Sequence, residues 1–282
     1  MKLLRHGAAG AERPGLLAAD STVRDLSGVV DDIDAAFIAN PARLDALKAV
    51  DPLSLPVVEG EVRLAPPFTG IGKIVGVGLN YHDHARECGL PIPEEPILFM
   101  KATTSLCGPY DAIRLPEGSE KTDWEVELGV VIGTTARKVS EADALAHVFG
   151  YCIAHDVSER AHQLEHGGQW TKGKSHDTFC PIGPWLVTAD EVKDPQKLHM
   201  WLELNGKRVQ DGSTATMVYG VAFIVAYLSQ FFTLMPGDII TTGTPPGVGM
   251  GMNPQRFLKP GDTMRLGIDG LGEQFQKVYR DK

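Results

Sequence analysis

Apolar and polar residues alternate over positions 121–132, and this pattern predicts a β-strand. Apolar side chains stand at every second position from 124 to 130, and they alternate with Asp123, Glu125, Glu127 and Gly129. Because successive side chains of a strand point to opposite faces, Glu125 and Glu127 should lie next to each other on one face. The run continues into 129–132, which is apolar on both faces and indicates burial.

A third carboxylate extends this pair. Asp156 follows another apolar run, 151–154. Neighbouring carboxylates repel each other, and burying them costs free energy unless a cation neutralises them. A solvated strand face is the alternative, since glutamate is mostly exposed in proteins. Three carboxylates without a cysteine suit a hard, oxygen-seeking ion, so Glu125, Glu127 and Asp156 predict a site for Mg²⁺ or Mn²⁺.

The N-terminal part of the chain differs in pattern from the rest. The elements expected there are strands at 1–5, 14–18 and 23–26 and a helix at 41–48 that begins with Asn40 and Pro41. A proline-rich connection over 51–67 follows. We therefore expect residues 1–67 to form a small N-terminal α+β domain with its linker, and residues 68–282 to form the main domain.

The main domain is predicted to be rich in short strands. Glycine and proline bound its β-prone runs, and long amphipathic helices are few. A capping box at Ser140 and Asp143 predicts a helix to about residue 149, and the apolar run 218–232 predicts a buried helix too short to span a bilayer. Glycines at 270 and 272 predict a terminal hairpin. The expected fold class is β-dominated α+β.

The net charge of the chain disfavours some classes of binding partner. A net charge of −9 and a pI near 5.5 disfavour nucleic acid and anionic membranes as partners. No apolar run of signal-peptide length follows the N-terminus. The four cysteines have neither zinc-site spacing nor an obvious pairing, so we expect reduced thiols in a cytoplasmic protein.

Residues 78–88 contain a candidate acid–base pair. Asn80 is predicted to cap a short helix that places His84 and Glu87 at i and i+3, where their side chains can touch. A carboxylate beside an imidazole fixes its tautomer and raises its basicity, as deprotonation of water requires. An exposed helix with ordinary charges is the alternative. His82 and Asp83 lie in the same stretch, so spacing alone does not settle the assignment.

Three further segments carry polar side chains suited to substrate contacts. Residues 156–163 are expected to become helical, with Ser158 as a possible cap. Arg160 and Gln163 then lie one helical turn apart and can point toward a carboxylate or carbonyl. Lys172 and Lys174 lie in a polar loop, where a lysine near a metal stabilises negative charge and a solvated loop is the alternative. The Gly/Pro-rich run 238–249 resembles anion-binding loops in composition, as do tight turns without a ligand.

Taken in order, six segments resemble the fumarylacetoacetate hydrolase family. They are Gly-x-Asn-Tyr-x-x-His-x-x-Glu at 78–87, Lys-x-x-x-Ser-x-x-Gly-Pro at 101–109, Glu-x-Glu at 125–127, Asp-x-Ser-x-Arg-x-x-Gln at 156–163, Lys-Ser-x-Asp-Thr-Phe-Cys-Pro at 174–181 and Thr-Gly-Thr-Pro-x-Gly-Val-Gly at 242–249. The resemblance runs from about residue 70 to the C-terminus. Six motifs in one order are specific, whereas one alone is weak.

The resemblance implies a mixed β-roll body, usually in a homodimer, and a role for each matching residue. The implied metal ligands are Glu125, Glu127 and Asp156, and the implied water-activating dyad on a lid is His84 and Glu87. The other implied roles belong to Lys174 near the metal, to Arg160 and Gln163 facing the substrate, and to Thr244 in the loop for the substrate's carboxylate end.

The implied reaction is hydrolysis of a carbon–carbon bond in a 2,4-diketo acid of the acylpyruvate type, with pyruvate as one product. The family also contains oxaloacetate decarboxylases and hydroxymuconate isomerases, which share the enolate intermediate. A non-catalytic divalent-ion binding protein is a different class, which needs the carboxylates but not His84, Glu87 or Lys174.

The head of the chain favours one subgroup. Residues 1–7, 12–16 and 23–27 resemble a bacterial subgroup whose members are often named ureidoglycolate lyase. Hydrolases of 2,4-diketo-3-deoxy-L-fuconate and -rhamnonate belong to it, so such a sugar acid is the predicted substrate. The polar side chains of the lid, His82, Asp83, Arg86 and Glu87, are expected to bind its hydroxyls.

Overall fold

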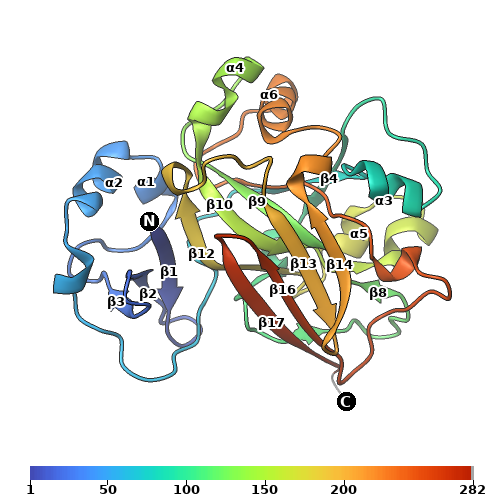
Figure 1. The fold of residues 1–282 in the computed structure, drawn as a ribbon, viewed down its shortest axis with the longest axis horizontal. Helices are drawn as coiled ribbons and strands as arrows, with labels where there is room; N and C mark the ends of the chain where they lie inside the picture. Colours follow the sequence, from blue (N-terminus) through green and yellow to red (C-terminus); the bar gives the residue numbers. More distant parts are fainter. Residues whose placement is uncertain (281–282) are drawn as a thin grey trace.

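A ten-stranded mixed sheet organises the computed structural model, which describes residues 1–280 (Figure 1). Its strands, in spatial order, are β3 (Val23–Asp25), β2 (Arg13–Leu17), β1 (Lys2–His6), β12 (Cys180–Thr188), β10 (Val148–His155), β9 (Val126–Ile132), β15 (Ile239–Thr241), β4 (Ile74–Gly78) and β5 (Ile97–Lys101), with β6 (Leu106–Cys107) beside β12. The pairs β4–β15 and β6–β12 are parallel, and the others are antiparallel.

A second sheet packs against the first and closes the core. It contains β14 (Lys207–Ser213), β13 (His199–Leu204), β16 (Thr263–Ile268), β17 (Gly272–Tyr279) and β7 (Ile113–Arg114). β16 and β17 form the antiparallel terminal hairpin that the glycines predicted. Leu128 of β9, Leu202 of β13 and Leu266 of β16 belong to one buried apolar cluster, which joins the two sheets. A short pair, β8 (Thr122–Asp123) and β11 (Ser158–Glu159), lies apart from both sheets.

Helical segments are short. They are α1 (Ala35–Ile38), α2 (Pro41–Lys48), α3 (His82–Glu87), α4 (Glu141–Ala144), α5 (Thr171–Lys174), α6 (Val221–Phe231), the π-helical turn η4 (Ala161–Glu165) and the 3-10 turns η1 (Pro52–Ser54), η2 (Thr103–Ser105), η3 (Leu145–His147), η5 (Ala189–Glu191), η6 (Thr214–Thr216) and η7 (Gly249–Gly251). Strand residues outnumber helical ones, 32% to 22%, so the β-dominated class is confirmed. Among residues 1–280, no helix is both long and apolar enough to cross a membrane.

The N-terminal strands continue the main sheet. β1 pairs with β12, where Leu3 lies opposite Leu186, and both side chains are fully buried in a shared cluster. The expected domain boundary near residue 67 stays a prediction. Figure 1 shows this N-terminal segment at one end of the molecule and α3 and α5 at the other.

Three local predictions were wrong. The helix expected to about residue 149 ends with η3, because Val148 starts β10 and pairs with Ile132. The strand expected over 121–132 is split into β8 and β9. Ser158 lies in β11 and its hydroxyl donates to the Asp156 carbonyl, so it does not cap a helix.

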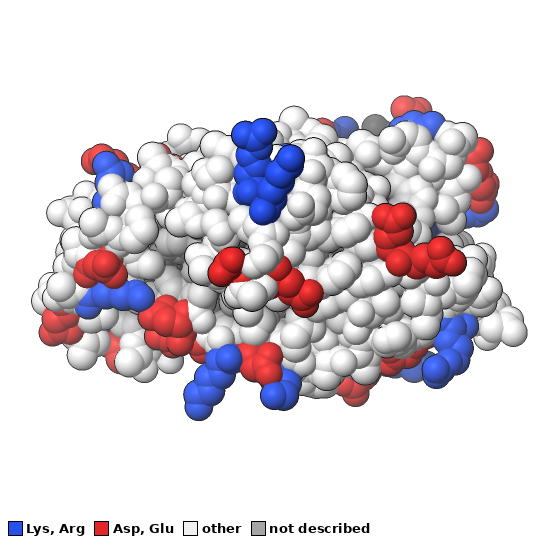
Figure 2. Space-filling model, turned by 90° about the horizontal axis from the view of Figure 1, so that it is seen from above, with Lys and Arg blue, Asp and Glu red and all other residues white. Residues whose placement is uncertain are grey.

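Charges on the face seen in Figure 2 are scattered among uncharged side chains, and red and blue groups alternate without a continuous basic surface. That distribution accords with the acidic balance of the chain. The exclusion of nucleic acid and membranes as partners stays a prediction.

Candidate active site and metal centre

Three carboxylates meet in the core between the main sheet and helix α3. Glu125, Glu127 and Asp156 offer oxygen atoms that all lie within 4.8 Å of one another, and all three side chains are buried. β9 carries Glu127, and the antiparallel β9–β10 pairing sets Val126 opposite His155. The Asp156 amide then donates to the Glu125 carbonyl at 3.0 Å. Strand pairing therefore assembles the group that the sequence predicted.

Buried cations neutralise two of these carboxylates. The Lys174 Nζ donates to Glu125 Oε2 at 2.7 Å and to Asp156 Oδ2 at 2.6 Å. Lys101 Nζ donates to the other Asp156 oxygen at 2.5 Å. Arg160 donates to Glu125 Oε1 at 2.7 Å. Sequence reasoning gave no role to Lys101, which ends the partly exposed strand β5 and is itself buried, as lysine rarely is.

Glu127 lacks such a partner. Within residues 1–280, no lysine, arginine or histidine forms a salt bridge with Glu127, and its Oε2 accepts one hydrogen bond, from the Gly243 N–H at 2.8 Å. Burial, together with the charges of Asp156 and Glu125, raises the pKa of Glu127 well above its ordinary value. A divalent cation among the three carboxylates would supply the missing positive charge. The oxygen-only donor set fits Mg²⁺ or Mn²⁺.

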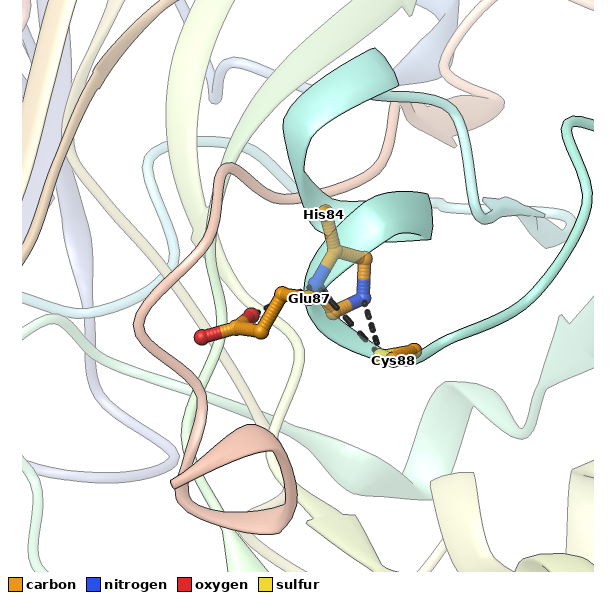
Figure 3. A group of neighbouring side chains, drawn as sticks. All are labelled: His84, Glu87 and Cys88. Atoms are coloured by element: carbon orange, nitrogen blue, oxygen red, sulfur yellow. Dashed lines mark hydrogen bonds and ion pairs between the residues drawn. The ribbon is translucent and has the colours of Figure 1, made fainter. Parts of the chain in front are cut away.

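The predicted dyad is present on α3. His84 Nδ1 lies 3.1 Å from Glu87 Oε2, and Cys88 Sγ lies 3.9 Å from both ring nitrogens. Figure 3 shows all three side chains on one turn of the helix, with the Glu87 carboxylate directed toward the neighbouring loop. Burial alone would lower the pKa of His84, but its contacts with Cys88 and Glu87 prevail and raise that pKa to about 9.

Glu87 also anchors α3 to the Gly/Pro loop. Its Oε1 accepts a hydrogen bond from the Gly247 N–H at 2.8 Å. The loop passes so close that a Cβ on Gly251 would lie 2.5 Å from the Glu87 Cδ, nearer than real Cβ atoms approach. The absence of a side chain at Gly251 thus allows the carboxylate to reach both His84 and the loop.

Asn80 does not cap α3 as predicted. The cap position belongs to Tyr81, which makes no side-chain cap hydrogen bond. The buried Asn80 amide instead donates to the Tyr219 carbonyl at 3.0 Å and to the Thr242 carbonyl at 2.8 Å. Asn80 therefore fixes the start of α3 to the end of β15.

The N–H groups of the Gly/Pro loop bind carboxylates of the chain itself. Gly243 donates to Glu127 and Gly247 to Glu87, as described above. Gly249 and Met250 donate to Asp123 at 2.7 and 3.0 Å, and Asp123 in turn accepts from Arg160 Nε at 2.9 Å. Asp123, which received no separate role from the sequence, therefore connects this loop to Arg160 and through it to Glu125.

One pocket gathers most of the predicted site. Its polar lining consists of His84, Glu125, Glu127, Arg160, Gln163, Lys174, Gly243 and Thr244. Glu87 and Asp156 contact this lining from behind. Lys172 is exposed and donates to the His166 carbonyl, outside the pocket. The apolar lining consists of Val77, Leu79, Leu90, Phe99, Leu164, Trp170 and Met250.

Three side chains expected to contact substrate form hydrogen bonds within the protein: Arg160, Gln163 and Thr244. The Arg160 guanidinium binds Asp123 and Glu125, and its Nη1 donates to Gln163 at 3.0 Å. The Thr244 hydroxyl donates to the Val126 carbonyl at 2.9 Å and accepts from Gln210 at 2.8 Å. No local sequence signal pointed to Gln210, which comes from the other sheet. These bonds hold the pocket wall in place.

Comparison with known proteins identifies the family. The family model described as fumarylacetoacetate (FAA) hydrolase C-terminal matches residues 73–279. The chain belongs to the fumarylacetoacetate hydrolase family. A protein of Burkholderia ambifaria (strain MC40-6) is 60% identical over 279 residues, covering 99% of each chain, and its name, "Putative hydrolase", gives no substrate.

Solved structures of two enzymes are similar over the whole length of this family member. Maleylpyruvate hydrolase from Sphingobium sp. SYK-6, in complex with manganese(II) ion and pyruvate, is 30% identical with a TM-score of 0.84, and 100% of each chain is covered. 5-Carboxymethyl-2-hydroxymuconate delta-isomerase from Mycobacterium smegmatis is 31% identical with a TM-score of 0.77, again over 100% of each chain. The predicted family and fold are confirmed, whereas the sugar-acid subgroup is not.

Proposed function

We propose that this protein is a hydrolase that depends on Mg²⁺ or Mn²⁺ and cleaves a carbon–carbon bond of an acylpyruvate. The observation that carries the proposal is the buried trio Glu125, Glu127 and Asp156 in one pocket with His84, which Glu87 orients. The similar maleylpyruvate hydrolase, which was solved with manganese and pyruvate, supports both the metal and the keto-acid product.

The chain's own residues would divide the chemistry among them. Mg²⁺ or Mn²⁺ on the three carboxylates would supply Lewis acidity for the keto acid and for the charge that develops on it. Neutral His84, oriented by Glu87, takes a proton from water, and the resulting hydroxide adds to the carbonyl distal to the carboxylate. The carbon–carbon bond breaks, its electron pair leaves with pyruvate enolate, and His84 returns the proton to that carbon. Lys174 adds positive charge where the enolate forms.

The identity of the substrate tail is a finer question. The head of the chain suggests 2,4-diketo-3-deoxy-L-fuconate or -rhamnonate. The lid does not add support, because His82 and Arg86 are exposed and lie outside the pocket lining. Leu90, Leu164 and Trp170 instead present apolar surface to the pocket. Comparing kcat/KM for acylpyruvates with hydroxylated tails and with apolar tails therefore determines which kind of tail the enzyme prefers.

A second candidate function uses the same site. The similarity to 5-carboxymethyl-2-hydroxymuconate delta-isomerase favours isomerisation of an unsaturated keto acid, in which a proton moves and no carbon–carbon bond breaks. Oxaloacetate decarboxylation would also pass through an enolate of pyruvate.

The test measures products with the metal-loaded protein. We expect loss of the β-diketone absorbance of an acylpyruvate together with formation of one pyruvate for each substrate consumed. His84→Ala and EDTA-treated wild type serve as controls. Interconversion of hydroxymuconate isomers without pyruvate release would contradict hydrolysis. Absence of turnover on every keto acid would instead favour a protein that only binds the ion.

A further inference from the structure

We propose that His84, Glu87 and Cys88 form a second metal site, one for Zn²⁺ or a similarly thiophilic ion, and that its occupation blocks catalysis. The binding half of this proposal stands on the geometry of α3. The inhibitory half rests on the proposed function, because it requires His84 to accept a proton.

The spacing of the three side chains suits one ion. They occupy positions i, i+3 and i+4 of one helical turn, and their ligand atoms all lie within 4.8 Å of one another (Figure 3). The observed separations are 3.1 Å from His84 Nδ1 to Glu87 Oε2 and 3.9 Å from Nδ1 to Cys88 Sγ. Tetrahedral zinc places nitrogen, oxygen and sulfur ligands roughly 3.3–3.6 Å apart. The His84–Glu87 separation therefore already suits an ion on Nδ1, whereas Cys88 Sγ, which lies 3.9 Å from both ring nitrogens, must turn toward the Nδ1 side to complete the set.

The donor types separate this site from the carboxylate trio. Zinc takes nitrogen, sulfur and carboxylate ligands, whereas three carboxylates favour Mg²⁺ or Mn²⁺. Cys88 is half-buried, and the other three cysteines are buried elsewhere in the fold. Among residues 1–280, the Cys88 Sγ makes polar contacts only with the two imidazole nitrogens of His84, each at 3.9 Å, so its one partner is another ligand of the proposed site.

The Gly/Pro loop prepares the third ligand. The Gly247 N–H holds Glu87 Oε1, which leaves Oε2 facing His84. Such a hydrogen bond orients a ligating carboxylate before the ion arrives.

Occupation of this site would remove the base. An imidazole with a metal ion on Nδ1 keeps its proton on Nε2, so no lone pair remains to accept a proton from water. The ion would also draw the Glu87 carboxylate away from its role beside His84. Inhibition would therefore occur while the carboxylate trio keeps its own metal.

Cobalt is the spectroscopic probe for the site. The full chain is first saturated with Mn²⁺ and then titrated with Co²⁺, which replaces zinc and absorbs by thiolate-to-metal charge transfer when sulfur binds it. We expect this band at one Co²⁺ per chain in the wild type and in the control Cys107→Ser, and its loss in Cys88→Ala. No band in the wild type, or an unchanged band in Cys88→Ala, would overturn the site.

Zinc inhibition provides the second readout. At saturating Mn²⁺, the zinc concentration that halves each protein's own rate should rise more than about tenfold in Cys88→Ala, because a ligand is lost. Reversal of wild-type inhibition by extra Mn²⁺ would place zinc in the carboxylate trio and refute the inhibitory half. The cobalt absorbance band can be measured whether or not the protein turns over a substrate. A protein that hydrolyses no acylpyruvate would thus refute the proposed function and the inhibitory half that rests on it, whereas a missing band would refute the second metal site and leave the proposed function standing.

Discussion

Replacing Glu127 by glutamine should stabilise the metal-free protein and weaken its response to metal. Glu127 lies within 4.8 Å of two other buried carboxylates and has no salt-bridge partner in residues 1–280. At an effective dielectric constant of about 20, each like-charge pair at this separation costs roughly 3 kcal/mol. Glu127 can take up a proton and so limit this repulsion. We therefore expect Glu127→Gln to raise the free energy of unfolding of the metal-free protein by roughly 1–3 kcal/mol.

Bound metal should make wild type more stable than Glu127→Gln, the reverse of the order expected without metal. A ligand at one hundred times its dissociation constant stabilises the folded state by about 2.7 kcal/mol. For a chain of this size, each kcal/mol corresponds to about 2–4 °C in Tm. Wild type should therefore gain roughly 5–10 °C on addition of Mn²⁺. The variant, which lacks one of three ligands, should gain far less.

Thermal unfolding followed by circular dichroism, in EDTA and with excess Mn²⁺, measures both effects. Glu159→Gln is the matched control. Glu159 is equally buried, but it accepts hydrogen bonds from the hydroxyls of Ser119 and Thr122 and lies outside the trio. Its variant should be destabilised in both conditions and keep the full metal shift. A lower Tm for Glu127→Gln in EDTA, or a metal shift equal to that of wild type, would refute the reasoning.

Three other predictions concern the base and its neighbours. His84→Ala should lower kcat by about 10²–10⁴-fold with unchanged Mn²⁺ binding in a titration; a rate near wild type would mean that another group activates water. Because contacts with Cys88 and Glu87 raise the pKa of His84 to about 9, its neutral, proton-accepting form grows as pH rises toward that value, and kcat/KM should rise with it. Glu87→Gln removes one of these contacts and should shift the rising limb to lower pH; an unmoved limb in the pH–rate profile contradicts the assignment. Lys174→Met removes one of the two cations that contact each of Glu125 and Asp156, while Arg160 and Lys101 remain. In urea unfolding without metal it should destabilise the protein by less than the roughly 3–5 kcal/mol expected for a buried charge left without any partner, and stability equal to that of wild type would contradict the role given to this lysine.

Features that depend on local pattern could be predicted from the sequence. The placement of Glu125 and Glu127 follows from strand periodicity, and Asp156 comes directly after the neighbouring strand β10. The His84–Glu87 contact needs only one helical turn. Glu125 and Glu127 lie two positions apart and His84 and Glu87 three, whereas Asp156 joins the carboxylates through the pairing of the consecutive strands β9 and β10.

Features that depend on distant contacts could not be predicted. Lys101 meets Asp156 across 55 positions, and Gln210 reaches Thr244 from a different sheet. The capping signal at Ser140 is real, since its hydroxyl accepts from the Asp143 N–H. Pairing of Val148 with Ile132 nevertheless ends that helical segment, because tertiary contacts override a local preference.

The Gly/Pro loop supports two parts of the site at once, the His84–Glu87 pair and the carboxylate trio. Its Gly247 N–H holds Glu87, and its Gly249 and Met250 N–H groups hold Asp123, which positions Arg160 beside Glu125. Displacement of this one segment would release the support of the proton acceptor and of the carboxylate cluster together. A half-assembled site, with an active base but a misaligned substrate, would then be rare. The loop thus couples the position of the His84–Glu87 pair to that of the carboxylate trio.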